Sequence, residues 1–165
     1  MSVRSYIKTA LIAALVALAF GGFLLHARIH PFTRNSSNFI PFISGILSII
    51  IVPLLFSYKR TVSYGYVING MLVILGTIAM SHFAIVHWPK PLTFAAILFQ
   101  TTLADIALLW GKFFVGKALF ELELRGYDAD TVKKGIFYRY PNYGWWLVHL
   151  AVISLIYLLG HLIWR

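Results

Sequence analysis

Histidine is the residue type in this sequence best suited to holding a cofactor, and the chain contains six histidines and no cysteine. A b-type haem inside a membrane is usually held by two imidazoles, one from each of two helices at similar depth. His82 and His161 meet this depth requirement in the helix arrangement derived below, and His26 is a substitute for either. We therefore treat these three residues as haem b candidates, with interfacial histidines that bind solvent or a loop as the alternative.

Asp105 lies in an apolar segment, where an ionisable side chain costs free energy and is a functional candidate by default. We place it in the inner half of that segment, with Thr101 one helical turn away and Lys112 seven residues later on about the same face. Lys112 is expected to extend its amine toward the lipid headgroups. Asp105, Thr101 and Asn69 are the candidates for quinone binding or proton transfer. The alternative is that Asp105 only forms a structural hydrogen bond to a neighbouring helix, with Asn69 as the expected partner.

Several kinds of site are excluded by what the sequence lacks. The absence of cysteine excludes thiolate metal sites, iron–sulfur clusters and disulfides. There is no Glu-x-x-His pair for a carboxylate-bridged metal centre, no glycine-rich phosphate loop and no serine nucleophile elbow. No metal site is predicted beyond the haem candidates, no catalytic residue is assigned, and a non-catalytic subunit is favoured over an enzyme.

One short motif resembles part of a known enzyme family. The residues from Arg139 to Tyr143 read Arg-Tyr-Pro-Asn-Tyr. This string resembles the Arg-His-Pro-x-Tyr motif of the isoprenylcysteine and phospholipid methyltransferases, with Tyr140 in place of the family's histidine. The resemblance implies part of an S-adenosylmethionine site. The simpler interpretation, which we favour, is that Pro141 sets the turn into the last helix.

Composition decides which elements must position these residues. Hydrophobic residues make up 60% of the 165 and charged residues only 12%, against roughly half and a quarter in ordinary soluble domains. A membrane-spanning helix needs about 20 mostly apolar residues. The sequence predicts an all-α polytopic membrane protein, a single domain over residues 1–165 that is a bundle of five transmembrane helices. The predicted spans are residues 9–25, 39–56, 66–88, 92–110 and 145–164, with a cytoplasmic connection over residues 111–144.

The basic residues predict how the bundle is oriented. With a cytoplasmic amino terminus, ten lysines and arginines fall on the cytoplasmic side and four on the other, in agreement with the positive-inside rule. The ten are Arg4, Lys8, Lys59, Arg60, Lys112, Lys117, Arg125, Lys133, Lys134 and Arg139, and the four are Arg28, Arg34, Lys90 and Arg165. The formal charge of +9 is thus explained by basic residues that face anionic lipid headgroups, and no nucleic-acid partner is expected. We predict a multi-pass protein of a bacterial cytoplasmic (inner) membrane with its carboxy terminus outside.

Two local features concern helix geometry. Pro53 is expected to kink the second span near its cytoplasmic end, because proline lacks an N–H and crowds the carbonyl four residues earlier. In the connection, Lys117 and Glu121 have the four-residue spacing that pairs charges on a helix, which Gly126 would then end. This segment is either an amphipathic helix along the headgroups or a docking surface for a soluble partner.

Three functions remain open from the sequence. The first is a small membrane subunit of a respiratory or electron-transfer complex, which anchors partners and contributes to a haem or quinone site. Its layout is similar, in helix number alone, to the cytochrome b anchors of fumarate and nitrate reductases. The second is a structural or assembly protein of the membrane without a cofactor, and the third is a small transporter that uses Asp105 and Asn69.

Overall fold

The computed structural model describes residues 2–29, 39–87, 93, 95, 102–125 and 143–163. This part of the chain is helical and contains no strand, which confirms the all-α prediction for it. The helices are α1 (Val3–Ile29), α2 (Phe39–Ile46), η2 (Leu47–Ile51), α3 (Val52–Ser57), α4 (Val62–His87), α6 (Thr102–Arg125) and α8 (Tyr143–Ile163). Because α2, η2 and α3 follow one another without a break, they form one rod, and the described helices make five rods.

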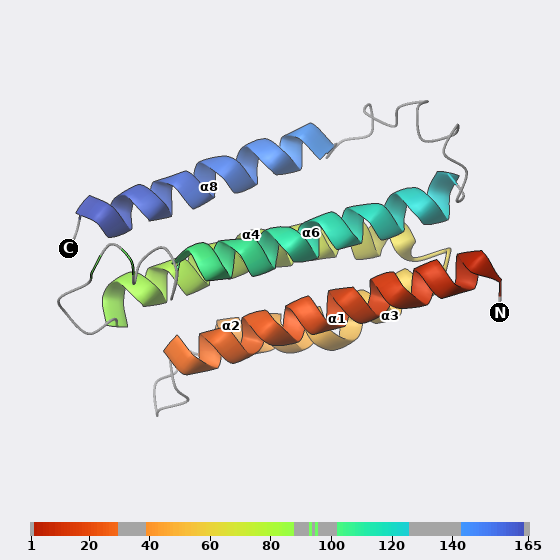
Figure 1. Ribbon diagram of the computed structural model, residues 1–165, viewed down its shortest axis with the longest axis horizontal. Coiled ribbons are helices and arrows are strands. Elements are labelled where there is room, and N and C mark those ends of the chain that lie inside the picture. Colours follow the sequence, from red (N-terminus) through yellow and green to blue (C-terminus); the bar gives the residue numbers. More distant parts are fainter. Residues whose placement is uncertain are drawn as a thin grey trace.

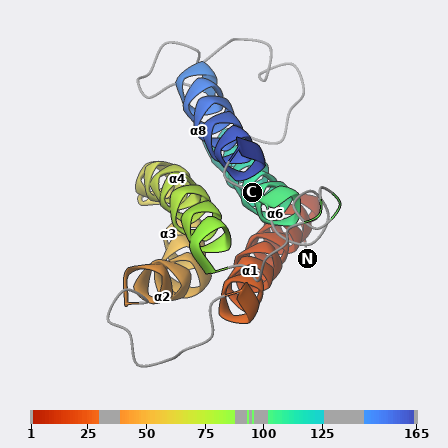
Figure 2. The same cartoon turned by 90° about the vertical axis from the view of Figure 1, so that its left-hand side faces the viewer.

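The rods lie side by side in three layers (Figure 1). Helix α8 forms one outer layer, α4 and α6 form the middle layer, and α1 with the α2–η2–α3 rod forms the third (Figure 2). The directions alternate along the chain, so that α1 begins and α8 ends at opposite ends of the bundle. Helix α4 packs against α3, α6 and α8, while α6 packs against α1 and α4.

Within the described residues, three helical segments are long and apolar enough to cross a bilayer: Val3–Ala27, Phe39–Ser57 and Val62–Ala79. Helix α8 contributes a shorter apolar stretch, Tyr143–Ile156. Large hydrophobic side chains are exposed on the outside of the described bundle, among them Phe20 and Leu24 on α1 and Leu155 and Ile156 on α8. An apolar exterior of this kind suits contact with lipid rather than with water.

The core includes a cluster of aromatic side chains from α4, α6 and α8. Tyr66 stacks on Phe120 with ring centroids 4.4 Å apart, and it meets the indole of Trp146 edge-on at 6.3 Å. The Trp146 side chain is buried because Gly70 leaves space for it. A Cβ atom built on Gly70 would lie 2.8 Å from Cη2 and Cζ2 of the indole, closer than real Cβ atoms approach other atoms.

Pro53 is accommodated by a π-helical turn instead of by a break in the second rod. The N–H of Val52 donates to the carbonyl of Leu47, five residues earlier, and Pro53 then stands in the first turn of α3. Such a wider turn relieves the crowding that a proline ring causes at the carbonyl four residues before it. The chain therefore stays helical from Phe39 to Ser57.

Charged residues join the first turns of α1 to the last turns of α6. Glu123 is 3% exposed, and its carboxylate lies 3.3 Å from the guanidinium of Arg4 and 3.3 Å from the amine of Lys8. Lys8 also donates to the carbonyl of Ser57 at 2.9 Å, so it joins α1 to α3 as well. The predicted pair of Lys117 and Glu121 is confirmed at 3.1 Å, and α6 continues to Arg125; Gly126 lies outside the described residues.

The fit between Gly70 and Trp146 can be tested by adding one methyl group. We expect Gly70→Ala to lower the free energy of unfolding in detergent by about 1–3 kcal/mol, because the rigid indole has no space to move into. The matched control is Gly22→Ala on α1, where an added Cβ meets no atom within 4 Å. Equal stability of the two variants in an SDS unfolding titration would contradict the packing described for α4 and α8.

Candidate ligand cavity inside the helix bundle

The histidine candidates lie toward one end of the bundle, which we call the histidine end. His26 is in the last turn of α1, His82 is in the second half of α4, and His161 is in the last turn of α8. These helix segments point the same way, since α1, α4 and α8 run parallel (Figure 1). The His26 side chain is buried. The side chains of His82 and His161 lie outside the described part, so their mutual geometry stays a prediction.

Asp105 belongs to the histidine end and not to the inner half where the sequence placed it. It stands in the first turn of α6, and α6 runs antiparallel to α1. A Cβ on Gly21 would contact the Leu108 side chain at 3.5 Å, which sets the register of the two helices. Counting one turn back from Leu108 brings the backbone of Asp105 level with the last turns of α1. Its side chain, and all of Thr101, lie outside the described residues.

Asn69 is buried, and its partner is not the expected one. Its Nδ2 donates to the backbone carbonyl of Lys112 at 3.2 Å, while its Oδ1 is buried without a hydrogen bond among the described residues. The contact is close because Gly116 has no side chain at that point. Lys112 follows Asp105 by seven residues, roughly 10 Å along the helix axis. Asn69 therefore binds the main chain of α6 well away from Asp105, and the predicted quinone set is not gathered at one level.

Lys112 is the residue whose position differs most from expectation. The predicted extension toward the headgroups is wrong, because the side chain is only 2% exposed and turns into the bundle. Its Nζ donates to the Oγ of Ser48 at 2.6 Å. Ser48 lies in the π-helical turn, near the middle of the second rod, and is itself buried. The amine is thus held in the interior, where a hydroxyl offers it a hydrogen bond.

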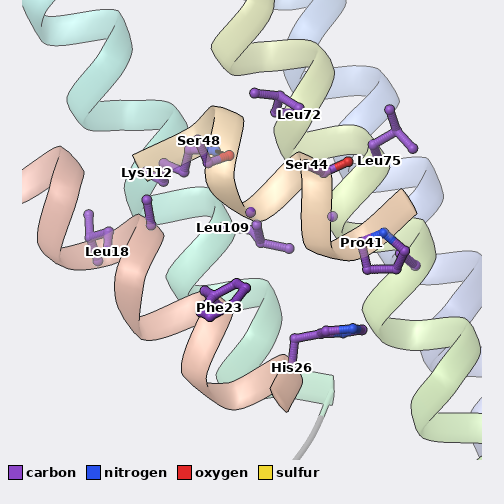
Figure 3. A pocket seen from close by; sticks show the side chains of 15 residues that line it. Leu18, Phe23, His26, Pro41, Ser44, Ser48, Leu72, Leu75, Leu109 and Lys112 are labelled. Atoms are coloured by element: carbon purple, nitrogen blue, oxygen red, sulfur yellow. Dashed lines mark hydrogen bonds between the residues drawn. The ribbon is translucent and has the colours of Figure 1, made fainter. Parts of the chain in front are cut away.

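A cavity of about 60 Å³ lies beside this amine, enclosed by α1, the α2–η2 segment, α4 and α6. We call it the bundle cavity. A volume of this size holds several water-sized groups. Its wall is mostly apolar, with Leu18, Phe23, Leu72 and Leu109 prominent, and Lys112 and Ser48 lie together along it while His26 lies farther down (Figure 3). Leu75, another wall residue, is 40% exposed, so the wall extends to the surface of the bundle.

The charge inside the bundle cavity is unbalanced within the described part of the chain. The three ion pairs among the described residues use Glu121 or Glu123, and none of them includes Lys112. An ammonium group has three N–H donors, of which Ser48 accepts one. A buried charge without a counter-charge is costly unless further acceptors surround it. The cavity can therefore bind an acceptor oxygen, whereas no group of three metal-ligating side chains occurs among the described residues.

Sequence reasoning missed the pair of Lys112 and Ser48, although two signals were present. Ser48 is a polar residue in an apolar span, and Pro53 follows it at a spacing that favours a distorted helix turn. Neither signal shows that α6 presents Lys112 to that turn, because the pairing joins residues 64 positions apart.

Comparisons with known proteins found no relative of this chain: no family model, no curated protein and no solved structure matches it. The functional argument therefore depends on the chain's own residues.

A double-mutant cycle tests whether Ser48 supports the buried amine. Ser48→Ala removes the acceptor and is expected to lower the free energy of unfolding by about 1–3 kcal/mol. Lys112→Met is expected to leave stability unchanged or to raise it, because an apolar side chain of similar length replaces a buried charge. In the Lys112→Met background Ser48→Ala should cost little. Additive effects of the two substitutions in SDS unfolding would refute the interaction.

Proposed function

We propose that this chain crosses the bilayer five times, with its amino terminus in the cytoplasm and its carboxy terminus outside. The proposal is supported by three segments that are long and apolar enough to span, by the alternating directions of the five rods, and by the apolar side chains exposed on their outer faces. Lys59 and Arg60, in the turn between α3 and α4, are exposed at the end of the bundle where α1 begins. Basic residues at that end favour the cytoplasmic side for it.

The absence of cysteine makes this topology directly testable. Single cysteines at Ser2 and Lys59, which are exposed, are expected to react with a membrane-impermeant maleimide only when the cytoplasmic face is accessible. A cysteine added after Arg165 is expected to react from the opposite face in intact cells. Labelling of both chain ends from the same side would contradict a five-span bundle.

We further propose that the protein is a small subunit of an electron-transfer complex in a bacterial cytoplasmic membrane, where it anchors partner proteins and holds a haem b at the histidine end. The observation that supports this is the position of His26, His82 and His161 in helix segments that lie toward one end of the bundle. Two imidazoles from different helices at one depth are what a membrane haem requires. The bundle cavity, at about 60 Å³, has too little room for a haem macrocycle, so the haem would lie outside it.

Native purification followed by absorption spectroscopy tests the haem and the partners together. The dithionite-reduced protein is expected to show a haem alpha band, and either His82→Ala or His161→Ala is expected to abolish it. His149→Ala is the matched control, because the Nδ1 of His149 lies 2.8 Å from the carbonyl of Trp145 in the first half of α8, away from the histidine end. A colourless preparation without iron or co-purifying proteins would rule out this proposal.

A cofactor-free assembly protein is the second candidate, and the tight helix contacts favour it. Added Cβ atoms on Gly45, Gly70 and Gly76 would each lie less than 3.0 Å from a side chain of a neighbouring helix. Close packing at small residues is how membrane helices associate without a hydrophobic driving force between them. In that case His82→Ala leaves the parent complex active, whereas Gly70→Ala reduces the amount of complex assembled.

A further inference from the structure

We propose that the bundle cavity binds the anionic oxygen head group of a single-chain amphiphile, with Lys112 and Ser48 as the head-group site. The inference depends on the proposal that the bundle lies in a bilayer, which the cysteine labelling tests separately. Its test is independent of the haem test, because the head-group site uses Lys112 and Ser48 whereas the haem test uses His82 and His161; His26, the substitute haem ligand, also lines the cavity.

The first support is the state of the Lys112 amine. It is 2% exposed, lines the cavity, and has one acceptor among the described side chains, the Oγ of Ser48 at 2.6 Å. In contrast, the amine of Lys8 at the other end of α1 has both a carboxylate and a carbonyl as partners. A carboxylate or phosphate oxygen in the cavity would supply the counter-charge and accept the remaining N–H groups, and hydrogen bonds between charged groups are the stronger kind.

The second support is the wall of the cavity. Leu18, Phe23 and Leu72 offer an apolar surface to a hydrocarbon chain, and the wall extends to the exposed side chain of Leu75. A chain that enters from the lipid can therefore lie along the wall with its head group at Lys112. The mostly apolar wall disfavours a fully hydrated anion such as inorganic phosphate, because its few polar side chains replace only part of the anion's water shell.

The third support is the way the helices make room for a ligand. The π-helical turn points Ser48 at the amine, and Gly22 on α1 leaves open space beside the cavity, since a Cβ there meets no atom within 4 Å. Other helix-facing glycines of the bundle, such as Gly76, are filled by a neighbouring side chain. Gly22 is therefore a position at the cavity wall where an added side chain starts from open space.

The test compares hexadecanoic acid with hexadecanol, which has the same chain and a neutral head. Binding to the full-length purified protein is measured in detergent by native mass spectrometry. The wild-type protein is expected to bind the acid at least about tenfold more tightly, a difference of about 1.4 kcal/mol. Lys112→Met is expected to remove this preference and Lys112→Arg to retain part of it, while SDS unfolding verifies that each variant is folded.

The Gly22→Leu variant distinguishes the effect of space in the cavity from the effect of the Lys112 charge. We expect it to weaken binding of the acid and of the alcohol alike, because the leucine side chain fills the space that the hydrocarbon chain would use. Equal binding of acid and alcohol by the wild-type protein would overturn the proposal. So would an acid preference that survives in Lys112→Met, or tighter binding of the neutral decylubiquinone than of the acid.

The source of the head group is distinguished in lipid nanodiscs. If nanodiscs of phosphatidylglycerol, but not of phosphatidylcholine, displace hexadecanoate from the wild-type protein, the natural ligand is a membrane phospholipid. If neither lipid displaces it, the ligand is a free fatty acid. Both results support an anionic oxygen at Lys112. The haem spectrum is unaffected by either, so failure of this inference and failure of the electron-transfer proposal are observed independently.

Discussion

Polar groups inside an apolar bundle must find their partners within the protein, and among the described residues α6 supplies partners to every other rod. Helix α6 contacts the α2–η2–α3 rod through Lys112 and Ser48, and α4 through the Lys112 carbonyl and Asn69. It reaches α8 through the indole of Trp110, which donates to Ser154 at 3.2 Å, and α1 through Glu123. Each of the other four rods is thus bonded to α6. Such bonds fix the register of helices whose apolar surfaces alone would allow sliding.

This arrangement explains why α6 is the least uniformly apolar of the helices and why it lies in the middle layer. Its charged side chains would be costly on a lipid-facing surface, whereas Lys117, Glu121 and Glu123 each have a charged partner among the described residues. Glu123 neutralises two cations of α1, and Lys117 pairs with Glu121 while its amine also lies over the ring of Tyr143, 4.2 Å from the centroid. Lys112 is the exception, because its charge has no described counterpart. That imbalance is why the cavity beside it is the strongest candidate for ligand binding.

The proposed sites adjoin each other and use different chemistry. The histidine end gathers residues suited to ligating iron, and the cavity, which runs from Lys112 and Ser48 toward His26, offers a cation and a hydroxyl in a mostly apolar wall. The backbone of Asp105 is level with the last turns of α1, and along α6 it is about two helical turns from Lys112. The π-helical turn before Pro53 connects backbone geometry to function, because it both accommodates the proline and presents Ser48 to the cavity.

The sequence by itself determined the helical class, the apolar segments of which three described ones are long enough to span a bilayer, and the pairing of Lys117 with Glu121. These features are local: they depend on composition, on runs of apolar residues and on four-residue spacing. Tertiary structure alone decided that Lys112 turns inward, that Asn69 binds the main chain of α6, and that Gly70 receives the indole of Trp146. Each of these joins residues far apart in the chain, and it depends on helix register and rotation. The sequence of an apolar helix says little about its register or rotation, because its faces are similarly apolar and only the neighbouring helices decide which face packs inward.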